Sequence, residues 1–228
     1  MGVVFVTGID TEVGKTVVCG LMARAAFDRS ASVATWKPVQ TGAAEPEDIR
    51  EHRRIANSGP LPEDGYGVTC PYLFEKPASP HLAAELEDRT IRKEVLDTTI
   101  GVLNGVYDHV IAEGAGGLMV PLNNIMTTMD YVQEKGWPLV IVASGRLGSI
   151  NHTFLTLYAA KNSGIDVVGV VYNKYPSVDG VIEEDTELVL KKGLNVLFPE
   201  ARLISIPKLE DVSDGDLDNL FEFVQMGR

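Results

Sequence analysis

Short apolar runs alternate with longer, helically periodic segments along this chain. The apolar runs lack polar interruptions, which is typical of strands buried on both faces of a parallel sheet. We predict strands at residues 3–6, 32–36, 110–112, 139–143, 167–172 and 203–206. We predict helices between and after them, at residues 16–27, 48–56, 81–87, 91–103, 150–161, 181–191 and 217–224. This alternation predicts an α/β fold with a mostly parallel sheet and helices on both faces.

Residues 58–80 break this pattern, because glycines and prolines interrupt any period there. We predict a long loop, and loops of that length in compact domains are usually functional or mobile. No internal repeat or low-complexity linker divides the sequence. With 45% apolar and 23% charged residues, the composition is that of a globular protein. We therefore expect residues 1–228 to form a single domain.

Charge and cysteine content exclude several classes of function. The net charge of −12 argues against non-specific nucleic-acid binding. No apolar run is long enough to span a bilayer, and the N-terminus enters a predicted strand directly, so we expect neither a membrane protein nor a signal peptide. The two cysteines, Cys19 and Cys70, form no disulfide framework or metal pattern. We therefore expect a cytoplasmic protein.

The first predicted strand leads into Gly8, and Gly14-Lys15-Thr16 opens the first predicted helix. This order is the context of a phosphate-binding loop, where glycine allows close backbone approach and helical amides face the phosphates. Lys15 would reach the β- and γ-phosphates, and the Thr16 hydroxyl would bind Mg²⁺. Five residues, rather than the usual four, separate Gly8 from Gly14. An ordinary strand-to-helix turn is the alternative, but the position after an N-terminal strand favours a P-loop nucleoside-triphosphate hydrolase-like fold.

Six residues follow the carboxyl ends of predicted strands. They are Gly8, Lys37, Glu113, Ser144, Asn173 and Pro207. Ligands of open α/β sheets bind at that edge, so we expect these residues to converge around one site.

These residues and the helix start near Asn151 suggest specific roles, and some also have a less specific interpretation. Lys37 could face the phosphates or the group that is phosphorylated, or could be a solvated turn residue. Glu113 could hold Mg²⁺ directly or through water, or could be incidental in a glycine-rich loop. The Asn173 carboxamide could contact adenine. The helix start near Asn151 suits a carboxylate, whereas His152 is more often a packed helix residue than a catalyst.

Several segments resemble the dethiobiotin synthetase family, in the family's order from the first residues to the strand before Pro207. These are Gly8-Ile9-Asp10-Thr11-Glu12-Val13-Gly14-Lys15-Thr16, Lys37-Pro38-Val39-Gln40-Thr41-Gly42, Pro71-Tyr72, Ser79-Pro80-His81, Glu113-Gly114-Ala115-Gly116-Gly117, Leu147-Gly148-Ser149-Ile150-Asn151-His152-Thr153 and Asn173. The resemblance implies a homodimeric, ATP- and Mg²⁺-dependent ligase of biotin biosynthesis. Its substrates would be 7,8-diaminononanoate, CO₂ and ATP, and its products dethiobiotin, ADP and phosphate.

The resemblance also implies roles for individual residues. Lys15 and Lys37 would be catalytic and flank the carbamate and the transferring phosphoryl group. The metal ligands would be Thr16, Glu113 and an aspartate, which is Asp48 if that segment aligns without a gap. The ATP-binding residues would be Glu12, Val13, Gly14, Lys15, Thr16, Val17, Asn173 and Pro207. The substrate-binding residues would be Thr11, Thr41, Leu147, Gly148 and Asn151, the last three taking the substrate carboxylate, with the dimer partner involved.

The chemistry of this reaction needs no protein nucleophile. One amine captures CO₂ as a carbamate, and phosphorylation by ATP converts the carbamate to a carbamic–phosphoric anhydride. The neighbouring amine then closes the ring. Positioning and charge neutralisation are the main catalytic demands, which two lysines and a metal ion can meet.

Two other functions share this type of fold. A partner-switching ATPase that positions chromosomes or division sites usually has an additional lysine early in the phosphate loop, where this chain has Ile9 and Asp10. An amidoligase of the cobyrinate type normally adds a glutamine-hydrolysing domain with a cysteine nucleophile. Neither cysteine here lies in a nucleophile context.

Overall fold

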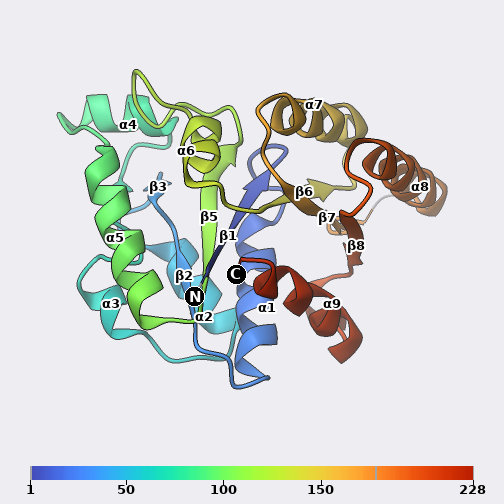
Figure 1. The fold of residues 1–228 in the computed structure, drawn as a ribbon, viewed down its shortest axis with the longest axis horizontal. Coiled ribbons are helices and arrows are strands. Elements are labelled where there is room, and N and C mark those ends of the chain that lie inside the picture. Colours follow the sequence, from blue (N-terminus) through green and yellow to red (C-terminus); the bar gives the residue numbers. More distant parts are fainter. Residues whose placement is uncertain (1, 178, 228) are drawn as a thin grey trace.

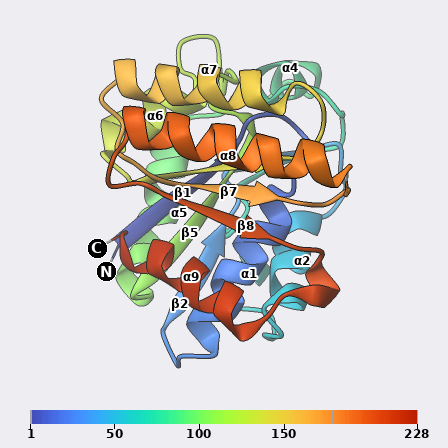
Figure 2. The same ribbon diagram turned by 90° about the vertical axis from the view of Figure 1, so that its right-hand side faces the viewer.

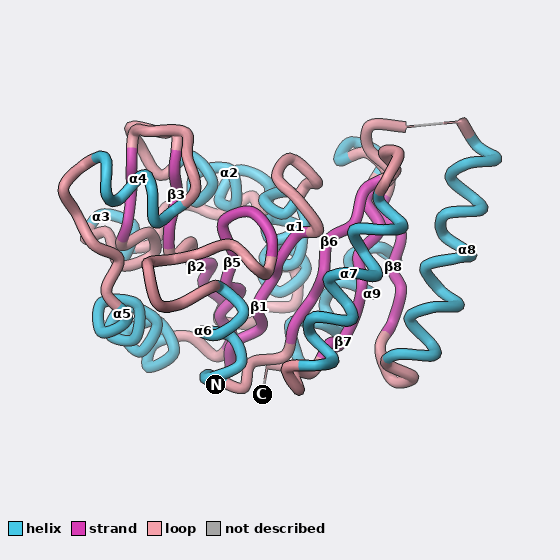
Figure 3. Tube along the Cα trace, turned by 90° about the horizontal axis from the view of Figure 1, so that it is seen from above, coloured by secondary structure: helices cyan, strands magenta, loops and turns pink. Residues whose placement is uncertain are grey.

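The computed structural model describes residues 2–177 and 179–227, and its centre is a six-stranded sheet. The strands are β1 (Gly2–Gly8), β2 (Val33–Trp36), β5 (His109–Gly117), β6 (Leu139–Ser144), β7 (Val167–Asn173) and β8 (Arg202–Ile206). They lie in the order β2-β5-β1-β6-β7-β8, which can be followed in Figure 3. Each neighbouring pair is parallel, so the predicted parallel sheet is confirmed.

Helices cover both faces of this sheet, as predicted. One face carries α1 (Lys15–Phe27), α2 (Glu47–Ile55) and α9 (Asp214–Gln225). The other carries α5 (Lys93–Val106), α6 (Thr128–Lys135), α7 (Ser149–Asn162) and α8 (Gly180–Leu197). Figure 1 gives the arrangement of these elements, and Figure 2 shows α7 and α8 on the opposite side of the strands from α1 and α9. Among the described residues, no helix is both long and apolar enough to cross a bilayer.

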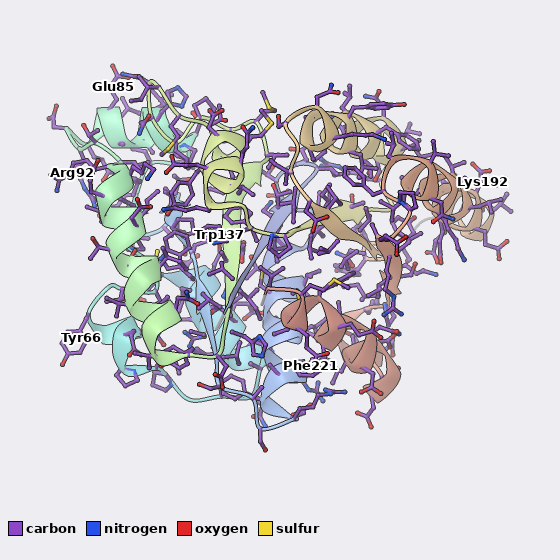
Figure 4. The ribbon with its side chains drawn as sticks, viewed as in Figure 1. Tyr66, Glu85, Arg92, Trp137, Lys192 and Phe221 are labelled. Atoms are coloured by element: carbon purple, nitrogen blue, oxygen red, sulfur yellow. The ribbon has the colours of Figure 1, made fainter. Side chains whose placement is uncertain are left out.

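The core consists of the strands and the inner sides of these helices. Every residue of β1 is buried, which explains its uninterrupted apolar sequence. Between the sheet and α6, Trp137 stacks on Phe5 and meets Trp36 and Tyr131 edge-on, with ring centroids 5.5–6.3 Å apart. In Figure 4 the partly buried Trp137 lies near the middle of the view, whereas Tyr66 points outward at the margin of the molecule.

The prediction of an unbroken loop over residues 58–80 was wrong. This segment contains the short helix α3 (Pro62–Gly65) and the strand β4 (Tyr72–Phe74), and α4 (Pro80–Leu86) begins at its end. β4 pairs in parallel with β3 (Val39–Thr41) to form a second, two-stranded sheet. Strands of three residues are too short to display a period of two, so their pairing cannot be recognised from the pattern alone.

The sequence patterns also failed to predict two further elements. One is the 3₁₀ turn η1 (Leu209–Asp211), and the other is α6. The α6 helix did carry a sequence signal, because the Thr127 side chain caps the Asp130 amide while Asp130 accepts from the Thr127 amide. That reciprocal arrangement is a capping box, which marks a helix start.

A close contact with α1 holds α2 in place. A Cβ atom added to Gly20 in α1 would lie 2.8 Å from Cβ of Ile55, the last residue of α2. Glycine therefore lets the two helices approach closely. Since α2 carries Asp48, the position of this candidate metal ligand depends on that contact.

We expect Gly20→Ala to lower the free energy of unfolding by about 1–3 kcal/mol, because the new methyl group overpacks the contact between α1 and α2. Gly101→Ala is the matched control on α5. Apart from the adjoining residues and the nearby backbone of α5, no described atom lies within 4 Å of the Cβ that this substitution would add. This control should raise the free energy of unfolding by about 0.5–1 kcal/mol. Urea denaturation measures both values, and equal effects would contradict the packing argument.

Candidate active site

The phosphate loop joins β1 to α1 and is fixed from two sides. Gly14 caps α1 in the left-handed conformation (φ 98°), and a Cβ there would lie 2.3 Å from Nδ2 of Asn173. Both observations require glycine at this position. The Lys15 ammonium donates a hydrogen bond to the Asp10 carbonyl at 2.8 Å. The side chain of Lys15 is thereby folded back over the loop that precedes it.

Lys37 forms the centre of a buried ionic cluster. It follows β2, and its Nζ atom lies 2.6 Å from Oδ2 of Asp48 in α2 and 2.7 Å from Oε1 of Glu113 in β5. It also donates to the Gly114 carbonyl at 3.3 Å. Lys37 is 5% exposed and Glu113 1% exposed, so water screens this pair weakly, whereas the Asp48 side chain is 27% exposed.

The Thr16 hydroxyl faces the same two carboxylates. Its Oγ1 atom lies 3.2 Å from Oδ1 of Asp48 and 3.1 Å from Oε1 of Glu113. A hydroxyl and two carboxylates form an all-oxygen donor set, the kind that a hard cation such as Mg²⁺ prefers. The residues present therefore fit this ion, and they lie beside the first turn of α1, where phosphate oxygens would bind.

The pKa values of these groups reflect their burial and mutual charges. Burial, together with the nearby Lys37 charge, lowers the pKa of Lys15 to about 8. Burial alone would also lower the pKa of Lys37, but the Glu113 and Asp48 carboxylates raise it well above its usual range. For Glu113, burial opposes ionisation, yet the Lys37 charge and the His52 hydrogen bond hold its pKa well below the usual range.

A pocket of about 290 Å³ lies next to the phosphate loop. Its lining includes Val17, Asn173 and Pro207, together with Tyr175 and residues 208–210. The Asn173 side chain donates to the Val13 carbonyl at 3.0 Å and accepts from the Tyr175 amide at 3.1 Å. Its carboxamide retains a second N–H and a second acceptor lone pair for a ligand. The structure thus brings three of the sequence-predicted ATP-binding residues to one pocket.

The remaining candidates of the phosphate loop and of β3 are more exposed. Thr11 and Glu12 are exposed, and Glu12 has a positive φ of 56°. Thr41 is half-buried at the end of β3. Within residues 2–177 and 179–227, no hydrogen bond connects Thr41 to Lys15, Thr16, Lys37, Asp48 or Glu113.

The predicted carboxylate site lies at the start of α7. Leu147 is 99% exposed, Gly148 caps the helix with a φ of 94°, and Asn151 is exposed on its first turn. An ion pair between Arg146 and Asp10 joins this segment to the phosphate loop. The two candidate binding regions are therefore adjacent, although the described part of the chain has no hydrogen bond between Leu147 or Asn151 and the Lys37 cluster.

Two polar residues behind the Lys37 cluster were not predicted as site residues from the sequence. His52, one helical turn beyond Asp48, contacts Glu113 at 2.6 Å, and Gln40 accepts from the Asp48 amide at 3.2 Å. The only available signal was the spacing of Asp48 and His52, which puts both on one face of a helix. Contacts between distant segments give no local pattern in the sequence.

Known proteins with similar sequences point to one family. The family model described as an AAA domain matches residues 3–215. The ATP-dependent dethiobiotin synthetase BioD 2 of Pasteurella multocida is 45% identical over 210 residues, covering 90% of this chain and 99% of the relative. The protein of the same name from Haemophilus influenzae is 47% identical over 178 residues, covering 78% and 93%.

Solved structures agree on the fold. A plasmid partition protein from Borrelia burgdorferi superposes with a TM-score of 0.56 at 12% identity, covering 97% of this chain and 96% of that protein. At this identity the likeness concerns the fold alone, and it supports the predicted P-loop α/β class. The two sequence relatives, at 45% and 47% identity over 99% and 93% of their own lengths, identify the family as well as the fold. The chain belongs to the dethiobiotin synthetase family.

Proposed function

We propose that this protein converts 7,8-diaminononanoate and CO₂ into dethiobiotin, with cleavage of ATP to ADP and phosphate. Membership of the dethiobiotin synthetase family supports the overall reaction. The structural observation that carries the proposal is the cluster in which Lys37 lies within 2.7 Å of two carboxylates that also face Thr16. This cluster combines cations with hard oxygen ligands beside a phosphate loop, as phosphoryl transfer requires.

The reaction proceeds in three steps. One substrate amine attacks CO₂ and loses a proton, giving a carbamate. A carbamate oxygen then attacks the γ-phosphorus of ATP, ADP leaves, and a carbamic–phosphoric anhydride forms. The second amine attacks the carbamate carbon and loses a proton, phosphate leaves with the electron pair of the C–O bond, and the five-membered ring closes. Holding both amines in one site gives the last step the advantage of an intramolecular reaction.

Lys15 and Lys37 stabilise the negative charge of the ATP phosphates, the carbamate and the transferring phosphoryl group. Lys15 follows the phosphate loop and binds the β- and γ-phosphates, whereas Lys37 follows a different strand and faces the carbamate and the transferring phosphoryl group. Thr16, Asp48 and Glu113 would hold Mg²⁺, which supplies charge neutralisation at the phosphate oxygens when bound. The oxygen contacts of 3.1–3.2 Å between them support this assignment.

ATP lies along the start of α1 in this proposal. The loop residues Glu12, Val13 and Gly14, with Lys15 and Thr16, surround the phosphates. Val17, Asn173 and Pro207 contact the base. Their common pocket of about 290 Å³ and the partly unsatisfied Asn173 carboxamide support the placement of adenine.

The organic substrate extends from the lysines toward α7. Thr11 and Thr41 line the diamine end, and the amides at Leu147 and Gly148, with Asn151, bind the carboxylate at the helix N-terminus. We propose that the protein is a homodimer and that the partner contributes to this end of the site. The exposed apolar side chains of Leu147, Met119, Leu155 and Tyr158 support an interface near α7.

We also propose a cytoplasmic location and one functional domain. Cys19 and Cys70 are both buried and free, as is typical of a reducing compartment. One hydrophobic cluster includes residues of β1, β4 and β8, which supports treating residues 1–228 as a unit.

A partner-switching ATPase is not favoured. The similarity to the plasmid partition protein is limited to 12% identity and therefore to the fold. Partner-switching ATPases usually have an early phosphate-loop lysine, and Ile9 and Asp10 occupy that part of the loop here.

The reaction itself can be tested by ADP release. ADP formation should be slow with ATP and Mg²⁺ alone and should rise only when diaminononanoate and bicarbonate are added together, because neither alone provides the phosphoryl acceptor. Mass spectrometry of the same mixtures should detect dethiobiotin. A monoamine analogue is the matched substrate control and should yield no ring product. ATP hydrolysis at full rate without the diamine, and without dethiobiotin, would refute the proposal.

The two lysines should differ in their kinetic effects. Lys37→Ala should lower kcat by about 10²–10³-fold, because it removes charge from the transferring group. Its ATP affinity should change less than that of Lys15→Ala. Initial-rate kinetics and calorimetric titration of ATP measure both quantities, in variants that circular dichroism shows to be folded. Equal losses of ATP affinity would instead make Lys37 a second phosphate anchor.

ATP affinity should depend on pH through Lys15. In the free protein its pKa is about 8, so the ammonium that attracts phosphate is lost as the pH rises through that value. The complex holds this proton more tightly than the free protein does, and affinity should therefore fall above pH 8, approaching tenfold per pH unit. Calorimetric titration between pH 7 and 9.5 tests this. Lys15→Met should bind ATP weakly without this decline, and the same decline in that variant would assign it to another group.

A further inference from the structure

The two carboxylate oxygens of Glu113 have different partners. Oε1 faces Thr16 and Lys37 at 3.1 and 2.7 Å, on the side of the candidate metal site. Oε2 lies 2.6 Å from Nε2 of His52, whose side chain is fully buried. His52 thus contacts the oxygen that is turned away from the site.

The partners of His52 determine where its proton lies. The ionised Glu113 carboxylate can only accept, so Nε2 carries a hydrogen and donates to Oε2. On the other side of the ring, Nδ1 lies 3.0 Å from the Thr35 hydroxyl. That hydroxyl accepts from the Arg53 guanidinium at 2.8 Å, which leaves its own proton for Nδ1. Thr35 and Arg53 therefore favour the tautomer that donates to Glu113.

Arg53 is itself anchored to the segment that follows α2. Its Nε and terminal nitrogen donate to the two oxygens of Asp64 at 3.0 and 2.8 Å, a bidentate pair with defined geometry. Asp64 also accepts from the Leu61 amide and the Thr69 hydroxyl, both at 2.8 Å. A continuous chain of hydrogen bonds thus runs from α3 to Glu113.

A direct metal-binding role for His52 fits the contacts less well. The Cys19 sulfur, a His52 nitrogen and a Glu113 oxygen lie within 4.8 Å of one another. Both ring nitrogens of His52, however, already face protein partners. Burial also raises the pKa of the Cys19 thiol, which disfavours the thiolate that a soft metal would need.

We propose that His52 is a positioning residue that keeps Glu113 oriented for the metal ion, with Thr35, Arg53 and Asp64 fixing its tautomer and place. This inference rests on the metal site of the proposed function. The physical reason is that a carboxylate binding a cation through one oxygen is free to rotate unless its second oxygen is also held. Because α2 carries both Asp48 and His52, one helix supplies a metal ligand and the support of another.

Replacing His52 by asparagine and, separately, by glutamine distinguishes the contributions of its two ring nitrogens. The Gln side chain can place its amide near the position of Nε2, whereas the shorter Asn side chain reaches only the position of Nδ1. We expect His52→Asn and His52→Leu to raise the dissociation constant for Mn²⁺ about 10-fold or more. His52→Gln should remain close to the wild type. Mn²⁺ binding is measured by electron paramagnetic resonance titration, with the non-hydrolysable β,γ-imido analogue of ATP present.

Two controls make the result specific. Arg54→Gln changes an exposed residue of α2 and should bind Mn²⁺ like the wild type. Glu113→Gln should weaken Mn²⁺ binding more than any His52 variant, because it removes a ligand charge. Thermal unfolding of the Gln and Asn variants of His52 verifies that both are folded, and this pair is sufficient for the test if His52→Leu does not fold.

A failure of the His52 role can be distinguished from a failure of the metal site. Wild-type Mn²⁺ affinity in His52→Asn would refute the role of His52, provided that Glu113→Gln weakens binding. Equal weakening in the Asn and Gln variants would also refute it, because packing rather than the Nε2 donor would then be responsible. Wild-type affinity in Glu113→Gln would overturn the metal site and, with it, the inference built on that site.

Discussion

The Lys37 ammonium lies between the Asp48 and Glu113 carboxylates, and the arrangement of the candidate site depends on this ion pairing. The three groups come from the end of β2, the start of α2 and the middle of β5, so their attraction joins three separate segments of the chain. Removing one partner of a buried pair typically costs about 3–5 kcal/mol, because the remaining charge is left desolvated. The same groups that would perform the chemistry therefore also hold the sheet edge together.

Sheet topology explains why these groups meet. Parallel strands end at one edge, and β1 lies between β5 and β6, so the phosphate loop emerges at the centre of that edge. Lys37 and Glu113 were predicted from the sequence because each is a polar residue at the end of an apolar run. For Lys37 this is also the end of β2, whereas β5 continues past Glu113 to Gly117, so the prediction that Glu113 follows its strand was wrong. The prediction that the two residues meet needed only the strands and their direction.

Other features could not be predicted from local patterns. The contact of His52 with Glu113 spans 61 residues, and only the folded chain brings the two together. The two-stranded sheet of β3 and β4 and the short α3 also lacked a recognisable period. The supposed loop between residues 58 and 80 therefore turned out to supply Asp64, whose hydrogen bonds anchor Arg53. By contrast, α6 could have been recognised from its capping box at Thr127 and Asp130.

The hydrogen bond from Asn173 to the Val13 carbonyl has a consequence for the thermodynamics of ligand binding. It connects the end of β7 to the phosphate loop across 160 residues of sequence, and it does so within the protein alone. A loop restrained in this way has less conformational entropy to lose when a ligand arrives, which is the meaning of preorganisation. The Asn173 side chain also lines the neighbouring pocket. A group bound in that pocket would therefore contact a residue that already restrains the phosphate loop. If the nucleotide binds as proposed, order at its two ends is thereby coupled through one carboxamide.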